Sequence, residues 1–390
     1  MRIVEIVCRH VRIPLKRRIK HASHERNSTD SLVVSCRLDD GSVGWGEGLP
    51  REYVTGDTVE ADLELFEQTA WRECVSQSLD SLDDAVARCQ SIRFDPPGES
   101  ARDSFGNPLK CAIELSLLDA VLRSGGLSFS DLTKIVVPNS PQPAPSLRYS
   151  GAITATIPGR VKWLARYYRW TGFEHCKIKV GVAGTDDVEL LKLVRKHIGP
   201  QMKLRIDANE AWTCDNLKAK TASLVPFDLV ALEQPVPHSQ IGCLSELRPG
   251  LGIPIMLDES LCSLTDAERA VDEGLCDYFN IRLSKCGGYL NSVRLAEMSR
   301  KAGLGFQLGC QVGETGILSA AGRHFATNVP GWIAAEGSFD HYLVKERLTK
   351  QDLTFEAGGK ARSLPGPGLG VSIDERAVKR VTVESRSATF

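Results

Sequence analysis

The sequence predicts an α/β protein in which a (β/α)8 barrel follows a smaller α+β unit. Apolar, strand-like runs alternate with amphipathic helical patterns through the middle of the chain. Three carboxylates, Asp207, Glu233 and Asp258, end three of these runs at intervals of 26 and 25 residues. One strand and its returning helix occupy a similar length in a parallel sheet. We therefore expect the three acids at the same end of successive strands, which in a (β/α)8 barrel is the catalytic face.

Size and charge narrow the class of protein. The chain has 390 residues, of which 42% are hydrophobic and 25% are charged, so it is long enough for two domains. Its 48 Lys and Arg nearly balance its 49 Asp and Glu, which gives no electrostatic reason to expect nucleic acid or an anionic membrane as partner. No apolar run has the length of a membrane span, and the first residues lack the apolar core of a secretory signal. We expect a cytoplasmic enzyme with a small-molecule substrate.

The first part of the chain, residues 1–135, is predicted to be the α+β unit. Residues 1–14 and 31–48 alternate with period two, and Asp39-Asp40-Gly41 has the composition of a hairpin turn. Apolar residues then recur every three or four positions, which predicts helices at 58–71, 81–92 and 109–126. The last of these ends at Gly125-Gly126, a typical helix stop.

A Pro- and Ser-rich stretch at 136–146 separates this unit from a barrel predicted over 145–350. Eight strands are predicted at 149–157, 175–180, 204–209, 229–234, 253–258, 278–284, 305–310 and 332–337. No G-x-G-x-x-G opens any of the intervening helices, which argues against a dinucleotide cofactor. The last segment, 351–390, returns to short strands and turns, and we expect it to pack on the N-terminal unit.

Twelve cysteines do not form a recognisable metal or disulfide pattern. The sequence has no C-x-x-C and no Cys–His cluster with metal spacing. Many of the cysteines lie in apolar contexts, as Cys111 and Cys176 do. We expect buried free thiols in a reducing cytoplasm.

The three acids offer oxygen ligands alone. Without His or Cys beside them, Asp207, Glu233 and Asp258 favour Mg²⁺, with Mn²⁺ as the alternative, over zinc. A divalent ion next to a substrate carboxylate stabilises the dianion that forms when the α-proton leaves.

Three lysines supply candidates for the proton transfer. Lys177 and Lys179 are two residues apart, so on a strand they share one face. Neighbouring cations lower each other's pKa, and we expect one of the two to act as a base. Lys285 is expected at the end of the strand at 278–284, across the barrel mouth. There it can act on the opposite face of the substrate, as a second acid or base or as an electrostatic stabiliser.

These groups form a known set of motifs, namely K-x-K (Lys177, Lys179), D-x-N (Asp207, Asn209), E-Q-P (Glu233), D-E-S (Asp258, Glu259) and K-x-G-G (Lys285, Gly287, Gly288). In these motifs the chain resembles the enolase superfamily, and within it the muconate-lactonizing enzymes (muconate cycloisomerases). The resemblance covers essentially the whole chain. It implies a capping α+β domain over a modified (β/α)8 barrel and a bound Mg²⁺.

The resemblance also implies individual roles. Lys179 is the acid/base, Lys177 tunes it, and Lys285 faces it across the substrate. Asn209 and Glu314, the latter in GETG, are expected near the substrate, and Glu259 supports the metal ligands. The capping-domain loops set specificity in this family, and two of them are the basic segment 16–29, which includes Arg26, and the segment around Tyr53. The five Lys and Arg of 16–29 suggest a second anionic group on the substrate.

Two departures from related motifs bear on the reaction. The segment FQLGCQVGE after the seventh strand has no His, which disfavours racemisation by a Lys/His pair. After the eighth strand, AAEGSFDHYLV lacks the D-x-D that dipeptide epimerases use to hold the substrate ammonium; its acids are Glu336 and Asp340. This absence weakens the case for an amino-acid or dipeptide substrate.

From these observations we expect a Mg²⁺-dependent homo-oligomeric enzyme that abstracts or donates a proton α to a substrate carboxylate. A muconate-type cycloisomerase is the first choice. The alternatives are dehydration like that of o-succinylbenzoate synthase, and epimerisation or racemisation of N-acyl amino acids or dipeptides. Different classes that remain open are a non-catalytic metal-binding barrel and a nicotinamide-dependent barrel oxidoreductase.

Overall fold

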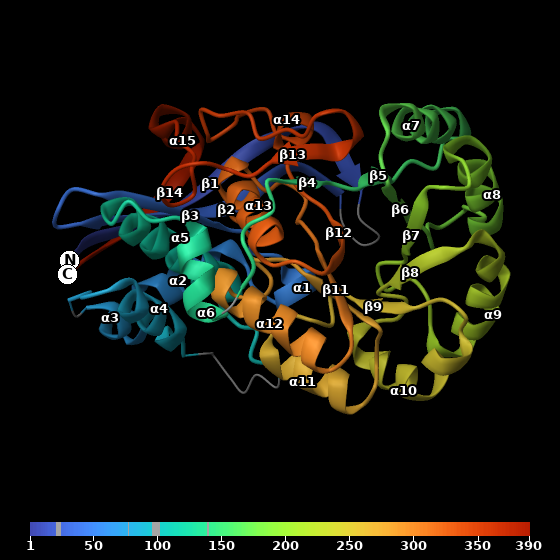
Figure 1. The fold of residues 1–390 in the computed structure, drawn as a ribbon, viewed down its shortest axis with the longest axis horizontal. Helices are drawn as coiled ribbons and strands as arrows, with labels where there is room; N and C mark the ends of the chain where they lie inside the picture. The colour runs from blue at the N-terminus through green and yellow to red at the C-terminus, as the bar shows by residue number, and fades with distance from the viewer. Residues whose placement is uncertain (21–24, 77, 96–101, 139) are drawn as a thin grey trace.

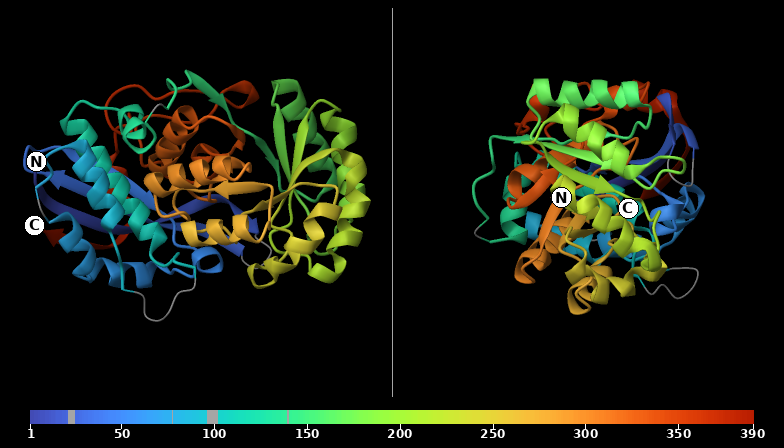
Figure 2. Two further views of the ribbon diagram at one scale, coloured as in Figure 1. Left: turned by 60° about the horizontal axis from the view of Figure 1, so that its bottom comes forward. Right: turned by 90° about the vertical axis from the view of Figure 1, so that its right-hand side faces the viewer.

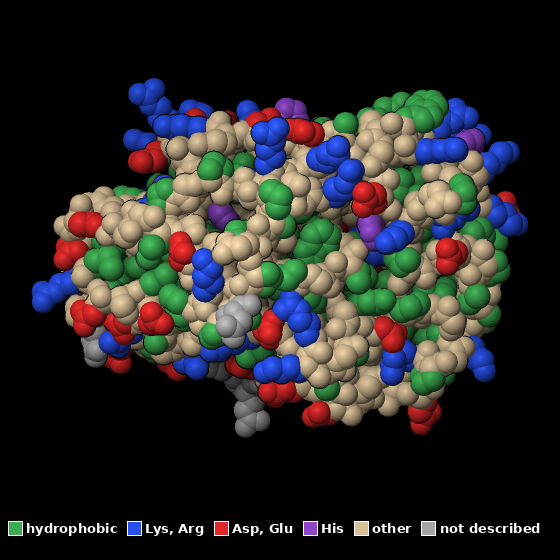
Figure 3. Space-filling view, in the orientation of Figure 1, with side chains coloured by type: hydrophobic (Ala, Val, Ile, Leu, Met, Phe, Trp, Pro, Cys, Tyr) green, Lys and Arg blue, Asp and Glu red, His purple; other side chains and the backbone are tan. Residues whose placement is uncertain are grey.

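The computed structural model describes residues 1–20, 25–76, 78–95, 102–138 and 140–390 of the chain. They form an elongated molecule with an antiparallel sheet and its helices at one end and a parallel sheet with its helices at the other (Figures 1 and 2). We call the first part the capping domain and the second the barrel. The predicted fold class is confirmed. On the face drawn in Figure 3, acidic and basic side chains are interspersed, in keeping with the balanced charge of the sequence.

The capping domain is built on a four-stranded sheet in the order β14-β1-β2-β3. Its strands are β1 (Ile3–Lys20), β2 (Glu25–Leu38), β3 (Val43–Gly48) and β14 (Thr382–Thr389). The turn between β2 and β3 contains Gly41, whose φ of +86° favours glycine. Strand β14 pairs with β1 from Glu5↔Thr389 to Val11↔Thr382, so the last strand of the chain lies beside the first.

The basic segment 16–29, which we expected to be a loop, is largely strand. Residues up to Lys20 extend β1, and β2 begins at Glu25, with Ile19 paired to Arg26; residues 21–24 lie outside the described residues. The alternation of buried and exposed side chains explains this, because it continues along β1 as far as the buried Leu15. The ends of β1 and β2 around the basic segment, residues 15–20 and 25–29, are called the β1–β2 arm below, and a bridge from Leu15 to Val344 joins this arm to the barrel.

Six helices accompany this sheet: α1 (Glu52–Thr55), α2 (Val59–Glu67), α3 (Ala70–Val75), α4 (Leu82–Ser91), α5 (Asn107–Ser124) and α6 (Phe129–Val136). The single helix predicted over 58–71 is wrong, because α2 ends at Glu67. Gln68 takes an extended conformation, and its side chain exchanges two hydrogen bonds with the backbone of Asp95. Trp71 then donates to the carbonyl of Phe66, which the helix break leaves free.

Helix α5 lies directly on the backbone of β3. A Cβ on Gly44, Gly46 or Gly48 would lie less than 3.0 Å from backbone atoms of α5. The alternating glycines of VGWGEG therefore allow this close approach, which no larger residue permits. Since α5 runs from the sheet to the barrel mouth, this packing places one helix in contact with both parts of the molecule (Figures 1 and 2).

The barrel strands follow one another in the order of the sequence, and all seven pairings are parallel. The eight predicted strands are present: β5 (Gly151–Ile153), β6 (His175–Lys179), β7 (Lys203–Asp207), β8 (Leu229–Glu233), β9 (Ile255–Leu257), β10 (Tyr278–Ile281), β11 (Gly305–Leu308) and β12 (Trp332–Ala335). A hydrogen bond from Ser150 N to Ala335 O links the first and last strands. Strand β10 ends before the predicted residue 284, so Lys285 lies in the turn after the strand.

The returning helices cover the outside of this sheet (Figure 2). They are α7 (Pro158–Thr171), α8 (Asp187–Ile198), α9 (Cys214–Leu224), α10 (Leu244–Leu247), α11 (Leu264–Asp272), α12 (Tyr289–Lys301) and α13 (Gly316–Asn328). The other elements are β4 (Ser146–Arg148), β13 (Lys360–Arg362), α14 (Asp340–Leu343), α15 (Glu375–Val381), and the 3₁₀ turns Val225–Phe227, His238–Cys243, Arg248–Gly250 and Ala357–Gly359. Among the described residues, no helix has the length and apolar character of a membrane span.

Two of the twelve cysteines are not free. Cys214 and Cys243 form a disulfide, which corrects the expectation of free thiols throughout. The two residues are 29 positions apart in the sequence. They meet because Cys214 begins the helix after β7 while Cys243 lies in the connection after β8, and adjacent parallel strands bring these connections together. The other ten are buried or half-buried free thiols, as predicted.

Candidate active site

The three predicted carboxylates meet at the carboxyl edge of the barrel. Asp207 ends β7, Glu233 ends β8 and is its register partner, and Asp258 directly follows β9. All three side chains are almost fully buried, with exposed fractions of 7%, 1% and 0%. Three buried acids side by side require positive charge, which the neighbouring elements supply.

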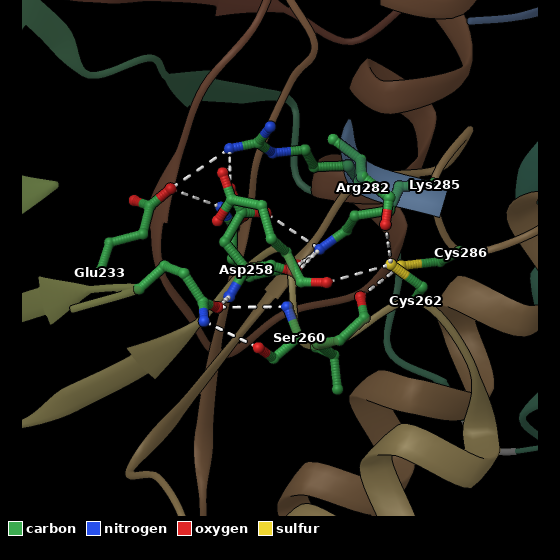
Figure 4. Close-up of polar contacts among 12 residues, drawn as sticks. Glu233, Asp258, Ser260, Cys262, Arg282, Lys285 and Cys286 are labelled. Atoms are coloured by element: carbon green, nitrogen blue, oxygen red, sulfur yellow. Dashed lines mark hydrogen bonds and ion pairs between the residues drawn. The ribbon is translucent and has the colours of Figure 1, made fainter. Parts of the chain in front are cut away.

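Lys177 and Arg282 supply part of that charge. Lys177 Nζ lies 3.2 Å from Glu233 Oε1, 3.6 Å from Asp207 Oδ2 and 2.9 Å from Glu336 Oε2. Arg282 donates to Glu233 Oε1 at 3.2 Å and to Asp258 Oδ2 (Figure 4). The cations therefore join the acids into one network.

Lys285 completes the network from the turn after β10. Its Nζ donates to the carboxylate of Asp258 at 2.9 Å, to the carbonyl of Asp258 at 2.6 Å and to the carbonyl of Asn280 at 2.9 Å (Figure 4). The side chain is fully buried. Three acceptors saturate an ammonium group, so Lys285 is held in one position.

The environment separates the pKa values of the acids. Burial and the charge of Asp207 raise the pKa of Glu233 to about 8. Burial acts to raise the pKa of Asp258 as well, but Arg282 and Lys285 outweigh it and lower that pKa to about 2. Burial and the charge of Asp258 raise the pKa of Glu259 well above its ordinary value.

The two lysines of K-x-K are not alike. Burial lowers the pKa of Lys179, with a contribution from Lys177, against the opposing charges of Asp207 and Glu259. Burial would lower the pKa of Lys177 as well, but Glu233 and Glu336 outweigh it and raise that pKa. The prediction that the pair lower each other's pKa therefore fails for Lys177, because that lysine faces the acids. Lys179 is less buried, and its ammonium donates no hydrogen bond to any described residue.

Of the other predicted site residues, Asn209 and Glu259 lie beside the acids, whereas Glu314 lies in a neighbouring loop. Asn209 N donates to Asp207 Oδ1 at 3.0 Å, and its side-chain amide donates to Glu259 Oε1 at 3.3 Å, so both residues lie beside the acids. Glu314 lies in the connection after β11, where its Oε1 accepts a hydrogen bond from Gln311 N at 2.5 Å. Burial raises the pKa of Glu314 to about 8. A small cavity is lined by both Glu314 and Glu336.

Arg26 and Tyr53 are brought together at the edge of the capping domain. The guanidinium of Arg26 lies 5.3 Å from the centre of the Tyr53 ring, which is the geometry of a cation–π contact. Behind them the buried Arg51 donates to Thr29 Oγ1 at 2.9 Å and to the carbonyl of Val312 at 3.2 Å. This arginine thus ties the β1–β2 arm to the loop that carries Glu314.

Sequence reasoning did not identify Arg282, and it noted Glu336 without assigning it a part in the acid network. It also missed Arg205, a fully buried residue that donates to Glu336 Oε1 at 3.0 Å and to Ser150 Oγ at 2.8 Å. The signal was present in the strands. Arg205 and Asp207 are two residues apart on one strand, so both point inward, as Lys177 and Lys179 do. A polar residue two positions before an acid that points into the barrel also points into the barrel. Such a pattern within an apolar run therefore predicts a further layer of polar side chains beneath the acids.

A capping α+β domain over a parallel eight-stranded barrel, with an acid triad between lysines at the carboxyl edge, defines a barrel enzyme of the enolase class. The family model described as "Enolase C-terminal domain-like" matches residues 160–377, which is more than half of the chain, and the protein belongs to this family.

Individual relatives extend over nearly the whole chain. The N-succinyl-L-Arg/Lys racemase of Bacillus cereus is 24% identical over 385 residues, or 98% of both chains, and its crystal structure superposes with a TM-score of 0.86 at full coverage of both. The dipeptide epimerase of Enterococcus faecalis, solved with Mg and the dipeptide L-Leu-L-Tyr, has a TM-score of 0.82 at 25% identity and covers 95% of this chain and 100% of its own. The 2-chloromuconate cycloisomerase of Rhodococcus opacus has a TM-score of 0.83 at 21% identity, with coverage of 98% and 100%.

Proposed function

We propose that this enzyme racemises or epimerises an N-acylated amino acid by moving a proton at the carbon next to the carboxylate. The observation that carries the proposal is the placement of Lys179 and Lys285. Their strands, β6 and β10, are separated by β7, β8 and β9, so the two lysines approach the acid network from opposite sides of the barrel mouth. One base on each face of a carbon is what inversion at that carbon requires.

The relatives move the proposal away from cycloisomerisation, which the sequence favoured first. The relative from Bacillus cereus is a racemase, and the relative from Enterococcus faecalis is a dipeptide epimerase. The likeness to the cycloisomerase is one of fold. A cycloisomerase also needs one proton carrier, so the presence of a second lysine at the carboxyl edge favours inversion.

The segment after β12 favours an acylated over a free amino group. Glu336, the acid that ends this strand region, is engaged by Lys177 and Arg205. Glu336 is therefore not free to pair with a substrate ammonium, and an N-acyl group removes the need for such a pair.

The acid triad fits a hard cation by the chemistry of its donors. Asp207, Glu233 and Asp258 are oxygen ligands on three adjacent strands, and we propose that they hold Mg²⁺. Among the described residues no three such groups are already spaced to enclose an ion, because Lys177 and Arg282 lie between the carboxylates. Metal binding would therefore require the carboxylates to be released from these cations. When bound, the ion neutralises the charge of the substrate carboxylate and of the dianion that forms on deprotonation.

The protein's own groups perform the proton transfer. In one direction Lys179 takes the α-proton and Lys285 delivers a proton to the opposite face, and in the other direction the roles reverse. Lys177, charged between Glu233 and Glu336, fixes the positive potential beside Lys179. Glu314, with a pKa of about 8, carries a proton at neutral pH and can donate a hydrogen bond to a substrate carboxylate oxygen.

The test is incubation of the Mg²⁺-loaded enzyme with each enantiomer of a panel of N-acyl amino acids in D₂O. We expect loss of optical rotation together with deuterium at the α-carbon. Formation of a lactone from cis,cis-muconate, without α-deuterium in any N-acyl amino acid, would instead establish the cycloisomerase.

The β1–β2 arm makes a separate prediction about specificity. Two of its basic residues contact neighbouring elements: Arg26 lies over the Tyr53 ring, and Lys16 Nζ donates to the carbonyl of His341 in α14. Replacing Arg17, Arg18 and Arg26 together by Gln should raise KM roughly tenfold for a substrate whose acyl group ends in a carboxylate. The KM for the uncharged acyl analogue should change much less.

The matched control neutralises three lysines on the outer face of the barrel helices, Lys192, Lys196 and Lys218. It makes the same change in net charge, so an equal rise in KM for both triple variants would show that the arm contributes a general field and no contact.

A further inference from the structure

The turn that carries Lys285 is held by the capping domain. Asn107, the first residue of α5, donates from its side-chain amide to the carbonyl of Lys285 at 2.9 Å and to the carbonyl of Cys262 at 2.7 Å. Asn107 is 5% exposed. Two turns along the same helix face, Glu114 Oε1 accepts a hydrogen bond from Leu290 N at 3.1 Å, at the start of α12. Helix α5 is therefore hydrogen-bonded to the turn both before and after Gly287 and Gly288.

Two side chains of α5 pack directly against the two glycines of K-x-G-G. Gly287 and Gly288 have φ of +76° and +113°. A Cβ on Gly287 would come within 3.0 Å of Asn107 Oδ1, and a Cβ on Gly288 within 3.0 Å of Glu114 Oε1. The motif thus provides space for two side chains from the other domain, in addition to a tight turn.

A third contact approaches from β3. The N–H of Leu49, just after that strand, donates to Ser284 Oγ at 2.8 Å. The backbone of Lys285 is consequently fixed by the capping domain, whereas its ammonium is fixed by Asp258 and Asn280 in the barrel.

Lys179 is placed differently. It lies on β6, in register with Asp207 of β7, so barrel strands position its backbone. Its ammonium has no hydrogen bond within the described part of the chain. The two lysines on opposite faces of the substrate are therefore positioned by different parts of the molecule.

We infer that Asn107 is a positioning residue for Lys285, and that the capping domain through this residue sets the geometry of proton transfer on one face of the substrate alone. The inference rests on the proposed function, in which Lys179 and Lys285 serve opposite faces. A displacement of about 1 Å in a reacting group can cost on the order of 100-fold in rate. Loss of the Asn107 amide should therefore appear as a defect confined to the face of Lys285.

The experiment measures α-deuterium exchange from each enantiomer separately, with the Mg²⁺-loaded full chain. Lys285→Ala first identifies the enantiomer whose proton faces Lys285. In Asn107→Ala, exchange of that enantiomer should fall roughly 10- to 100-fold, whereas exchange of the other should stay within about twofold of the wild type. Asn107→Asp, which keeps the size but removes the N–H donors, should show the same one-face loss.

Two further variants complete the design. Thr221→Ala removes another buried side-chain donor, one that donates to the carbonyl of Leu217 on α9, and should leave both exchange rates unchanged. Ser284→Ala removes the acceptor for Leu49 on the other side of the turn, and should give a smaller loss on the same face. It carries the test if circular dichroism shows that the Asn107 variants do not fold.

Equal losses on both faces, or wild-type exchange on both faces in Asn107→Ala, Asn107→Asp and Ser284→Ala, overturn the inference. Failure of the proposed function is detected separately, from the exchange measured for the wild type and for Lys285→Ala. A wild-type enzyme that exchanges one enantiomer alone, or a Lys285→Ala variant that exchanges both, removes the two-base mechanism and with it the one-face role of Asn107.

Discussion

Replacement of Lys179 by alanine is expected to abolish racemisation in both directions, with a loss of about 10²- to 10⁴-fold in turnover. Both directions fail because inversion needs a proton carrier on each face, and Lys285 cannot reach the face of Lys179. The enantiomer whose α-proton faces Lys285 should still exchange that proton with D₂O, since the acid network and Lys285 are intact. Lys285→Ala should show the reverse, namely no turnover and exchange of the other enantiomer alone.

The measurement is a time course of α-deuterium by mass spectrometry beside polarimetry, for both enantiomers and both variants. Lys203→Ala is the matched control, because Lys203 is an exposed lysine at the opposite end of a barrel strand. Full turnover and exchange in Lys179→Ala would transfer the base role to Lys177 or Lys285. Loss of both exchange reactions in each variant would show that the lysines hold the substrate and do not move its proton.

Removal of one acid of the triad is expected to abolish both Mg²⁺ binding and turnover. Asp258→Asn should be the most damaging to stability as well, because it leaves the fully buried Lys285 without its carboxylate partner. Breaking one side of a buried ion pair costs about 3–5 kcal/mol. Asp207→Asn and Glu233→Gln remove one ligand each, while Lys177 keeps other acids nearby.

Thermal unfolding with and without Mg²⁺ reads this out independently of activity. An ion at 100 times its Kd stabilises the native state by about 2.7 kcal/mol, so Tm of the wild type should rise with Mg²⁺. The three variants should show no such rise. Asp277→Asn, which changes a half-exposed barrel acid paired with Arg248, is the control and should keep the wild-type response. Wild-type turnover without added metal in all three triad variants would mean that the metal site is misassigned.

The barrel could be predicted from the sequence because each of its strands is recognisable as a local run of apolar residues. Eight apolar runs separated by helical patterns are eight strands, and acids that end such runs necessarily share an edge when the strands are parallel. Asp207, Glu233 and Asp258 could therefore be placed together from spacing alone. Lys285 could be placed at the same edge, though it lies in a turn and not on the strand.

The features that the sequence did not reveal depend on contacts between distant segments. Arg282 was not identified because nothing local distinguishes an arginine that reaches two carboxylates from one that points to solvent. Cys214 and Cys243 pair because adjacent connections meet, which no spacing rule records. The break at Gln68 depends on Asp95, 27 residues away. The roles of Asn107 and Glu114 at the K-x-G-G turn likewise appear when two domains are seen together.

The pairing of β1 with β14 has a consequence for the synthesis of this chain. Strand β1 is flanked by β2 on one side and by β14 on the other, so one edge of β1 is completed by a strand that is translated much later. Until residues 382–389 emerge, that edge presents unpaired N–H and C=O groups beside the buried Ile6 and Cys8. The whole barrel is translated in that interval. A nascent chain of this protein therefore carries an open sheet edge while the barrel is translated, and such an edge can pair with another chain.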